Sequence, residues 1–110
     1  MIITLNCSAI QNRDDIHNQF NDAFGFPSYY GRNMDALIDC LSDADDPTVG
    51  MCTNSVEPGT KITIVLDGYS NLNQVRPDLI NEITGCIAFV NWRRIEANEP
   101  ALFCIAYDSD

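Results

Sequence analysis

Apolar residues gather in three short runs along the chain, and these runs predict β-strands. Ile2 to Leu5 is β-branched and ends at polar residues, Lys61 to Leu66 is nearly continuous, and Ala101 to Tyr107 reads Ala-Leu-Phe-Cys-Ile-Ala-Tyr. Runs of this length that are rich in β-branched and aromatic residues are typical of strands. The near-continuous hydrophobicity of the second and third runs favours parallel strands, which are usually buried on both faces.

Between the first two strands, apolar positions recur at helical spacings. One segment follows Asn12, a suitable N-cap with acidic residues in the next turn, and ends at Gly25 and Pro27. A second segment has Asn33 as its cap and runs to about Ser42. The spacing predicts two helices that each bury one apolar stripe.

The second half of the chain predicts a long loop, a turn and a third helix. Asp43 to Thr60 has no sustained apolar period, and loops of this length tend to be functional or mobile, so it is a possible second contact region. A turn through Ser70 to Asn73 precedes a helix from Pro77 to Ala97. Gly85 in its interior costs about 1 kcal/mol relative to alanine, which suggests a kink or a close packing contact.

The order of predicted elements is β-α-α-β-α-β. Strands separated by helical crossovers indicate an α/β fold with a three-stranded parallel sheet packed with helices. The 110 residues suffice for one hydrophobic core, and no repeat, low-complexity tract or linker divides them. We therefore expect a single domain over residues 1–110 with a long loop at 43–60.

Features of targeting and of metal binding are absent from the sequence. No apolar run approaches the roughly 20 residues that cross a bilayer, and residues 1–10 lack the pattern of a secretory signal, so a cytoplasmic location is expected. The 5 cysteines are an odd number, and their spacing fits neither a metal knuckle nor a disulfide framework. Reduced, mostly buried thiols follow, with no metal or cofactor.

Charge is the strongest feature of the composition. The chain has 16 acidic and 6 basic residues, a net charge of -10. Direct binding to nucleic acid is not expected, since a phosphate backbone requires clustered lysine and arginine. A basic protein is a suitable partner because a negative surface accelerates encounter with a positive site. Solubility alone explains the acidity equally well.

The second predicted helix places two carboxylates one turn apart. Its apolar residues form a core stripe at Met34, Leu37, Ile38 and Leu41. Asp35, Asp39 and Ser42 then fall together beside that stripe. The acids repel at this spacing, and only Asp35 lies in the first turn, where the helix dipole favours it. The pair is therefore a candidate binding site, with an ordinary solvated face as the alternative.

An aromatic-glycine turn precedes this helix. Tyr29 and Tyr30 stand before Gly31, which is expected to supply a backbone conformation that other residues resist. We expect Tyr29 to point outward, where a large ring with a polar tip can anchor an interface, and Tyr30 to point into the core.

The turn and helix together resemble the barstar family of intracellular ribonuclease inhibitors. The likeness is carried by the motif Tyr29-Tyr30-Gly31-x-Asn33-x-Asp35-Ala36-Leu37-x-Asp39-Cys40-Leu41, and the leading strand and first helix also fit, with His17 at a matching place. The sequence-level resemblance covers about residues 1–42. Beyond them only the order of elements carries over.

The resemblance implies a non-catalytic inhibitor whose second helix and preceding turn plug the active site of a basic ribonuclease or related toxin. The aspartate that matches Asp39 occupies the place of the substrate phosphate in this family, and the positions matching Tyr29, Gly31, Asn33 and Asp35 line the same contact. A monomer in a 1:1 complex and a role as an immunity protein are expected.

The chain departs from the family pattern at three places. Ile38 replaces a tryptophan of the family's second helix, and the loop at 43–60 is longer than usual. An acid contributed by the family's last helix has Asp78 and Glu82 as its nearest candidates. These departures keep open an alternative function, a small acidic interaction domain that binds a partner other than a nuclease.

Other candidates for chemistry have simpler explanations. His17 has no serine, cysteine or aspartate at catalytic spacing. The aspartates of the 43–60 loop lack the glycine and glutamate of a calcium loop. Arg93 and Arg94 are explained by the dipole at a helix C-terminus, and phosphate-binding glycine motifs are missing. An enzyme is not expected.

Overall fold

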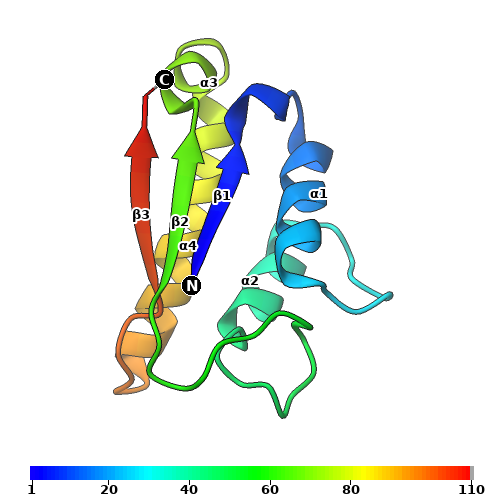
Figure 1. Ribbon diagram of the computed structural model, residues 1–110, viewed down its shortest axis with the longest axis vertical. Coiled ribbons are helices and arrows are strands. Elements are labelled where there is room, and N and C mark those ends of the chain that lie inside the picture. The colour runs from blue at the N-terminus through cyan, green and yellow to red at the C-terminus, as the bar shows by residue number, and fades with distance from the viewer. Residues whose placement is uncertain (110) are drawn as a thin grey trace.

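A three-stranded parallel sheet and the helices packed on it form the structure, a computed structural model that describes residues 1–109 (Figure 1). The predicted α/β fold and the order β-α-α-β-α-β are confirmed. The elements in chain order are β1 (Ile2–Asn6), the 3₁₀ turn η1 (Cys7–Ala9), α1 (Arg13–Phe24), α2 (Met34–Ser42), β2 (Ile62–Asp67), α3 (Tyr69–Val75), α4 (Pro77–Glu96) and β3 (Phe103–Asp108).

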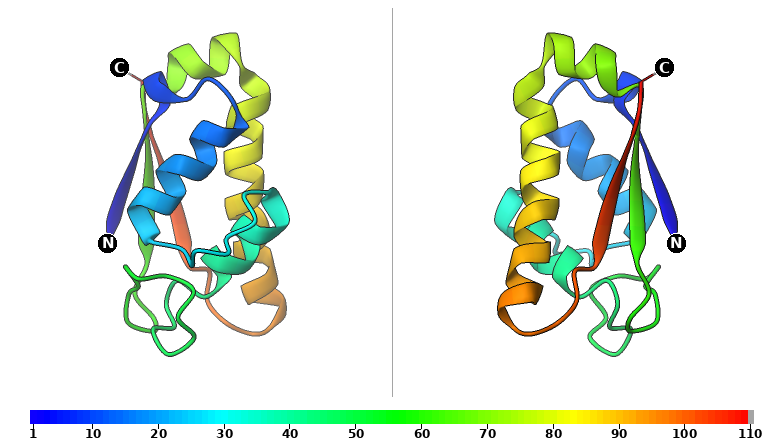
Figure 2. Two further views of the ribbon diagram at one scale, coloured as in Figure 1. Left: turned by 90° about the vertical axis from the view of Figure 1, so that its right-hand side faces the viewer. Right: turned by 90° about the vertical axis from the view of Figure 1, so that its left-hand side faces the viewer.

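The strands lie in sequence order, β1-β2-β3, with Ile64 of β2 paired to Ile3 on one side and to Ile105 on the other. The helices all lie on one face of the sheet (Figure 2). Right-handed crossovers that advance in one direction put every connection on the same side. The burial of both faces that the second and third apolar runs favoured is therefore wrong for β3: Cys104 is exposed on the outer face, as is Ile2 of β1, at 73%.

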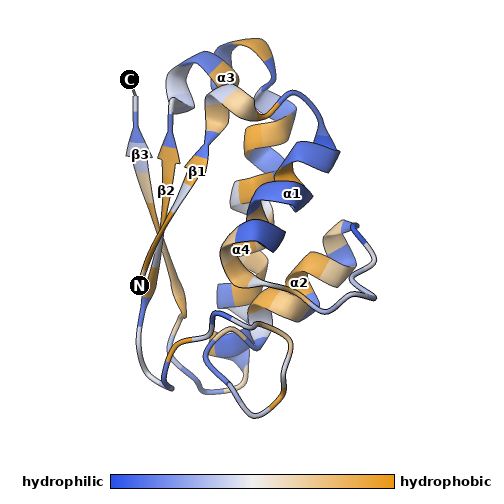
Figure 3. Ribbon diagram, turned by 45° about the vertical axis from the view of Figure 1, so that its right-hand side comes forward, coloured by the Kyte–Doolittle hydropathy of each residue, from blue (hydrophilic) through white to orange (hydrophobic). Residues whose placement is uncertain are grey.

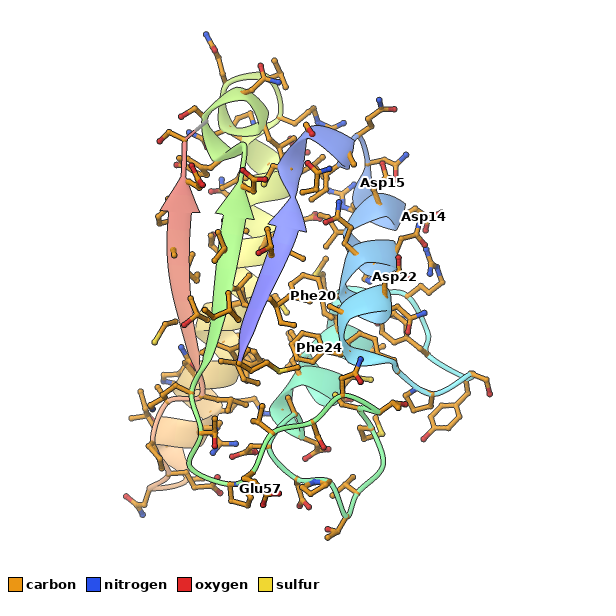
Figure 4. All side chains as sticks on the ribbon, in the orientation of Figure 1. Asp14, Asp15, Phe20, Asp22, Phe24 and Glu57 are labelled. Carbon is orange, nitrogen blue, oxygen red and sulfur yellow. The ribbon has the colours of Figure 1, made fainter. Side chains whose placement is uncertain are left out.

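The helices begin and end at the residues that the sequence indicated. Asn12 and Asn33 each accept a hydrogen bond from a backbone amide of the first turn, from Asp15 N at 3.0 Å and Ala36 N at 2.8 Å. Gly25 ends α1 with a left-handed φ of 67°. Hydrophilic residues follow the outer side of α1 (Figure 3), whereas Phe20 and Phe24 lie fully buried between α1 and the sheet (Figure 4).

The predicted turn through Ser70 to Asn73 is instead the short helix α3. Gly68, with a φ of 77°, lets the chain turn directly from β2 into it. The helix buries Leu72, and the rings of Tyr69 and Tyr107 pack with centroids 4.5 Å apart. Two turns with a single buried residue are too short to produce a readable helical period.

The predicted long loop, residues 43–60, contains no helix or strand. Its residues form hydrogen bonds with the C-terminal end of α1. The amides of Thr53 and Asn54 donate to the carbonyls of Gly25 and Phe24, both at 2.9 Å. The Asn54 side chain donates to Ala23 O at 2.9 Å. These bonds satisfy carbonyls that a helix end would otherwise leave open.

The same loop is joined to α4 by a buried ion pair. Both terminal nitrogens of Arg94 donate to the carboxylate of Asp45 at 2.8 Å, and the two side chains are only 11% and 10% exposed. Arg94 also donates to Pro100 O at 3.1 Å. The bidentate geometry fixes the loop against the C-terminal end of α4.

Replacing Asp45→Asn is expected to lower the free energy of unfolding by about 3 kcal/mol, because it removes the buried anion of Arg94 and leaves only the exposed Glu99 carboxylate, 3.5 Å away, to pair with it. Urea denaturation measures the change. The exposed Asp22, labelled on α1 in Figure 4, provides the control, and Asp22→Asn should stay within about 0.5 kcal/mol of wild type. Equal effects of the two substitutions would contradict a structural role for the pair.

Candidate partner-binding site

Helix α2 presents its two predicted site carboxylates to solvent. It buries Leu37, Cys40 and Leu41, so the opposite side of a nine-residue helix must face outward. Asp35 and Asp39 are both exposed there, and the Asp39 side chain is 66% exposed. The helical spacing therefore placed both acids correctly.

The two tyrosines of the preceding turn point in opposite directions, as predicted. Tyr30 packs against Phe26 at a ring-centroid distance of 4.7 Å, and its hydroxyl is hydrogen-bonded to Nδ1 of His17. Tyr29 is 76% exposed, and its hydroxyl donates to Met51 Sδ at 3.7 Å. One ring anchors the turn in the core while the other is available to a partner.

Gly31 does not have the unusual backbone conformation that was expected of it. The left-handed residue of this turn is Arg32, with a φ of 55°. The Arg32 side chain donates to Asn18 Oδ1 at 2.8 Å and to Asp14 O at 3.2 Å, and these bonds hold the turn against α1. A Cβ at Gly31 would lie 3.3 Å from Asn33 Nδ2, so close approach to the helix cap favours glycine here.

The remaining predicted site residues have structural roles and lie around the acid pair. Asn33 is the helix cap described above. Ile38 is partly buried against the core. The Ser42 hydroxyl donates to Ile38 O at 2.7 Å, and Ser42 lines a polar hollow of about 260 Å³ between the C-terminal ends of α2 and α4.

Arg93 lies at the candidate site, although the sequence did not indicate it there. Its Nη1 lies 3.4 Å from Asp39 Oδ1 and donates to it across the boundary between α4 and α2. Arg93 and Arg94 do stand in the last turn of α4, but each is also paired with an acid of another segment. Nothing local to the sequence indicates a contact between residues so far apart along the chain.

Negative charge is dense around this end of α2. The pKa of Asp43 is raised, first by burial and then by the charges of Asp46, Asp39 and Asp45, while Arg93 opposes the rise. The neighbouring negative charges raise the pKa of Asp43 because they disfavour its ionisation. The site can therefore attract and bind cationic groups.

His17 connects α1 to the tyrosine turn as a buried, neutral group. It is 3% exposed, and burial lowers its pKa, with Arg32 acting in the same direction and Asp14 and Glu82 against it. Burial disfavours the charged imidazolium. The hydrogen bond to Tyr30 indicates a structural histidine rather than a general base.

The thiols offer no nucleophile in the core. Four of the cysteines are buried and Cys104 is exposed, and none forms a disulfide within residues 1–109. Burial raises the pKa of Cys7 and Cys40 to about 11 and that of Cys52 and Cys86 to about 12. The expectation of reduced, mostly buried thiols is confirmed, and the buried thiols are protonated at neutral pH.

Within residues 1–109, no group of three or more histidine, cysteine, aspartate or glutamate side chains is arranged to hold a metal ion. Across the same residues, no helix combines the length and apolar character needed to traverse a bilayer.

Comparison with known proteins identifies the fold family. Residues 1–106 match the family model described as Barstar (barnase inhibitor). The chain belongs to the barstar family. A protein of Bacillus subtilis (strain 168) named "Putative ribonuclease inhibitor YrdF" is 50% identical over 32 residues, which are 29% of this chain and 35% of that protein. The barstar match therefore extends well past the residues 1–42 that carried the resemblance, and barstar proteins are inhibitors rather than enzymes.

Acidification is expected to destabilise the protein through His17. The unfolded histidine takes up a proton near its ordinary pKa of about 6.5, whereas the folded one resists until lower pH. The unfolded state then binds more protons, so the free energy of unfolding falls as pH drops below about 6.5.

Urea denaturation between pH 7.5 and pH 5 measures this dependence. His17 is the chain's only histidine, so His17→Gln should flatten that part of the curve while leaving the carboxylate transitions at lower pH. Parallel curves for the two proteins would contradict the assignment.

Proposed function

We propose that this protein is a non-catalytic inhibitor that binds the active site of a basic ribonuclease or related toxin. It forms a 1:1 complex as a monomer and acts in the cytoplasm as an immunity protein for the cell that makes it. The observation that carries the proposal is the exposed carboxylate pair of Asp35 and Asp39 on α2, within a chain of net charge -10.

The chemistry of the site supports blockade of a phosphate-binding centre. A carboxylate presents two oxygens that can replace a pair of phosphate oxygens in the bidentate fork of an arginine. Asp39 supplies the central carboxylate, and Asp35 supports it one turn away. Tyr29 extends the contact from the adjacent turn, which Tyr30 and His17 hold in place from the core.

In the free protein, Asp39 already pairs with an arginine, Arg93, as the proposal requires it to do with an arginine of the nuclease. The Arg93 guanidinium lies against Asp39, at the place where an arginine of the nuclease would bind. Both side chains are largely exposed, so solvent screening keeps their pairing weak. An incoming arginine fork can therefore replace Arg93 with little cost.

The first experiment measures inhibition and affinity against a panel of basic microbial ribonucleases, barnase included. Asp39→Ala should weaken the complex by about 3 kcal/mol, or roughly 150-fold, because it leaves cationic groups of the enzyme without their anion. Isothermal titration at two salt concentrations gives the affinity and its screening.

Asp22→Ala is the matched control, since it removes an equal charge from the exposed side of α1. Its affinity should stay near that of wild type. An unchanged affinity for Asp39→Ala would overturn the proposed site. Capture of a non-nuclease partner through the 43–60 loop, insensitive to changes at both acids, would favour the alternative of an acidic interaction domain.

The Arg93→Gln variant tests the competing ion pair. Removing the Arg93 guanidinium frees Asp39 for the partner and should tighten the complex. The gain should be only about 0.5 kcal/mol, or roughly twofold, because an exposed ion pair of this kind contributes little. Stopped-flow measurements at low salt give the association and dissociation rate constants, and their ratio gives the affinity. Lys61→Gln is the control: it removes one positive charge at a position away from α2, and so separates the local effect from the effect of net charge. Weaker binding by Arg93→Gln would show that Arg93 contributes to the complex instead of competing with it.

A further inference from the structure

The turn before α2 has its left-handed backbone position at an unfavourable residue. Arg32 has a φ of 55°, whereas glycine and asparagine are the residues that adopt this conformation most readily. Both of them flank Arg32 directly, as Gly31 and Asn33, yet the left-handed position falls on the arginine. An interaction outside the turn must therefore compensate for the strained backbone.

The side chain of Arg32 supplies that compensation by binding α1. Its Nη2 donates to Asn18 Oδ1 at 2.8 Å and to Asp14 O at 3.2 Å, and it lies 3.3 Å from Asp14 Oδ1. The two acceptor residues stand one turn apart on the exposed side of α1, where Figure 4 labels Asp14. We call these three residues, Arg32, Asp14 and Asn18, the arginine clamp.

The clamp joins the proposed binding turn to a helix that carries none of the proposed contact residues. Arg32 lies between Tyr29 and Asp35 along the chain. A change of its backbone to an ordinary right-handed conformation would redirect the chain and move Tyr29 relative to the acids of α2. The contact of Tyr30 with the core holds one side chain of the turn but does not set the backbone of Arg32.

We propose that Arg32 is a positioning residue for the nuclease contact, whose clamp on α1 selects the left-handed turn that places Tyr29 and Gly31 beside the acid pair of α2. This inference rests on the proposed function and adds two residues of α1 to the determinants of affinity. Exposed pairs of this kind contribute little to global stability. The clamp therefore acts on the fraction of molecules whose turn is ready to bind, and the affinity scales with that fraction.

The charge of Arg32 and its geometry have opposite effects on binding, so the two can be separated. The chain has a net charge of -10, and a negative surface attracts a basic partner. Removing the positive charge of Arg32 would by itself strengthen that attraction. A loss of affinity in Arg32→Ala therefore reports the loss of the clamp and not the change in charge.

The first arm of the test is isothermal titration with a nuclease that the wild-type protein binds. Arg32→Ala should weaken the complex about tenfold, because alanine retains the unfavourable backbone and loses the clamp. Arg32→Gly should weaken it only about threefold, because glycine tolerates the left-handed φ without selecting it. Asn18→Ala removes the shortest bond of the clamp without changing the charge and should also weaken the complex about threefold.

Asn71→Ala is the matched control, since it makes the same substitution at an exposed asparagine of α3 and should leave the affinity unchanged. In the double variant, Asn18→Ala should cause no further loss beyond that of Arg32→Ala, because both changes remove one contact. Thermal unfolding checks that each variant is folded. Additive losses, or a loss in Arg32→Ala with none in Asn18→Ala, would show that Arg32 acts on the partner directly and would overturn the proposal.

The second arm measures the turn in the free protein by ¹⁵N relaxation. Asn18→Ala should lower the backbone order parameters of Gly31 and Arg32, because the clamp no longer restricts the turn, and leave those of α2 unchanged. Order parameters equal to those of the wild-type protein at both residues would contradict the clamp.

The proposed function and the clamp fail separately. If Asn18→Ala weakens the complex and Asp39→Ala does not, the carboxylate site is wrong and the clamp stands. If Asp39→Ala weakens the complex and Asn18→Ala does not, the clamp is overturned and the inhibitory site stands. If no nuclease binds the wild-type protein, the proposed function fails, and the relaxation measurement alone decides whether the clamp holds the turn.

Discussion

The packing of α2 against the core and α4 is the constraint on which the rest of the candidate site depends. Burial of Leu37 and Leu41 fixes the rotation of a helix that is only nine residues long. With that rotation fixed, Asp35 and Asp39 face solvent, and Asp39 lies on the side of α2 where Arg93 of α4 reaches it. Charge repulsion between the acids is small beside the hydrophobic burial that holds them in place.

The turn before α2 has a second support that is independent of α4. Tyr30 and His17 form a buried polar contact, and Arg32 binds α1 from the outside of the same turn. The turn that carries Tyr29 is thus held from two directions, by the core and by α1. Such preorganisation reduces the conformational entropy that binding would otherwise cost.

Local features of the sequence predicted most of the fold and the acid pair. Caps at Asn12 and Asn33, and the spacing of Asp35 and Asp39, depend on a few neighbouring residues and were placed correctly. What failed depends on distant parts of the chain. The contact of Arg93 with Asp39 joins different helices, and the open outer face of the sheet follows from the order of the strands. The left-handed residue of the turn is Arg32, one position later than expected, and its side chain is hydrogen-bonded to α1, a contact that the local sequence does not indicate.

The 43–60 loop has a consequence for how this fold can vary in length. Its amides complete the C-terminal carbonyls of α1, and its Asp45 neutralises a buried cation of α4. Shortening the loop would remove both the hydrogen bonds to the last carbonyls of α1 and the carboxylate that pairs with Arg94 of α4. The loop is therefore a structural support whose length is coupled to the ends of α1 and α4, and between those two attachment points the buried Cys52, whose thiol donates to Cys40 O, joins it to α2 as well.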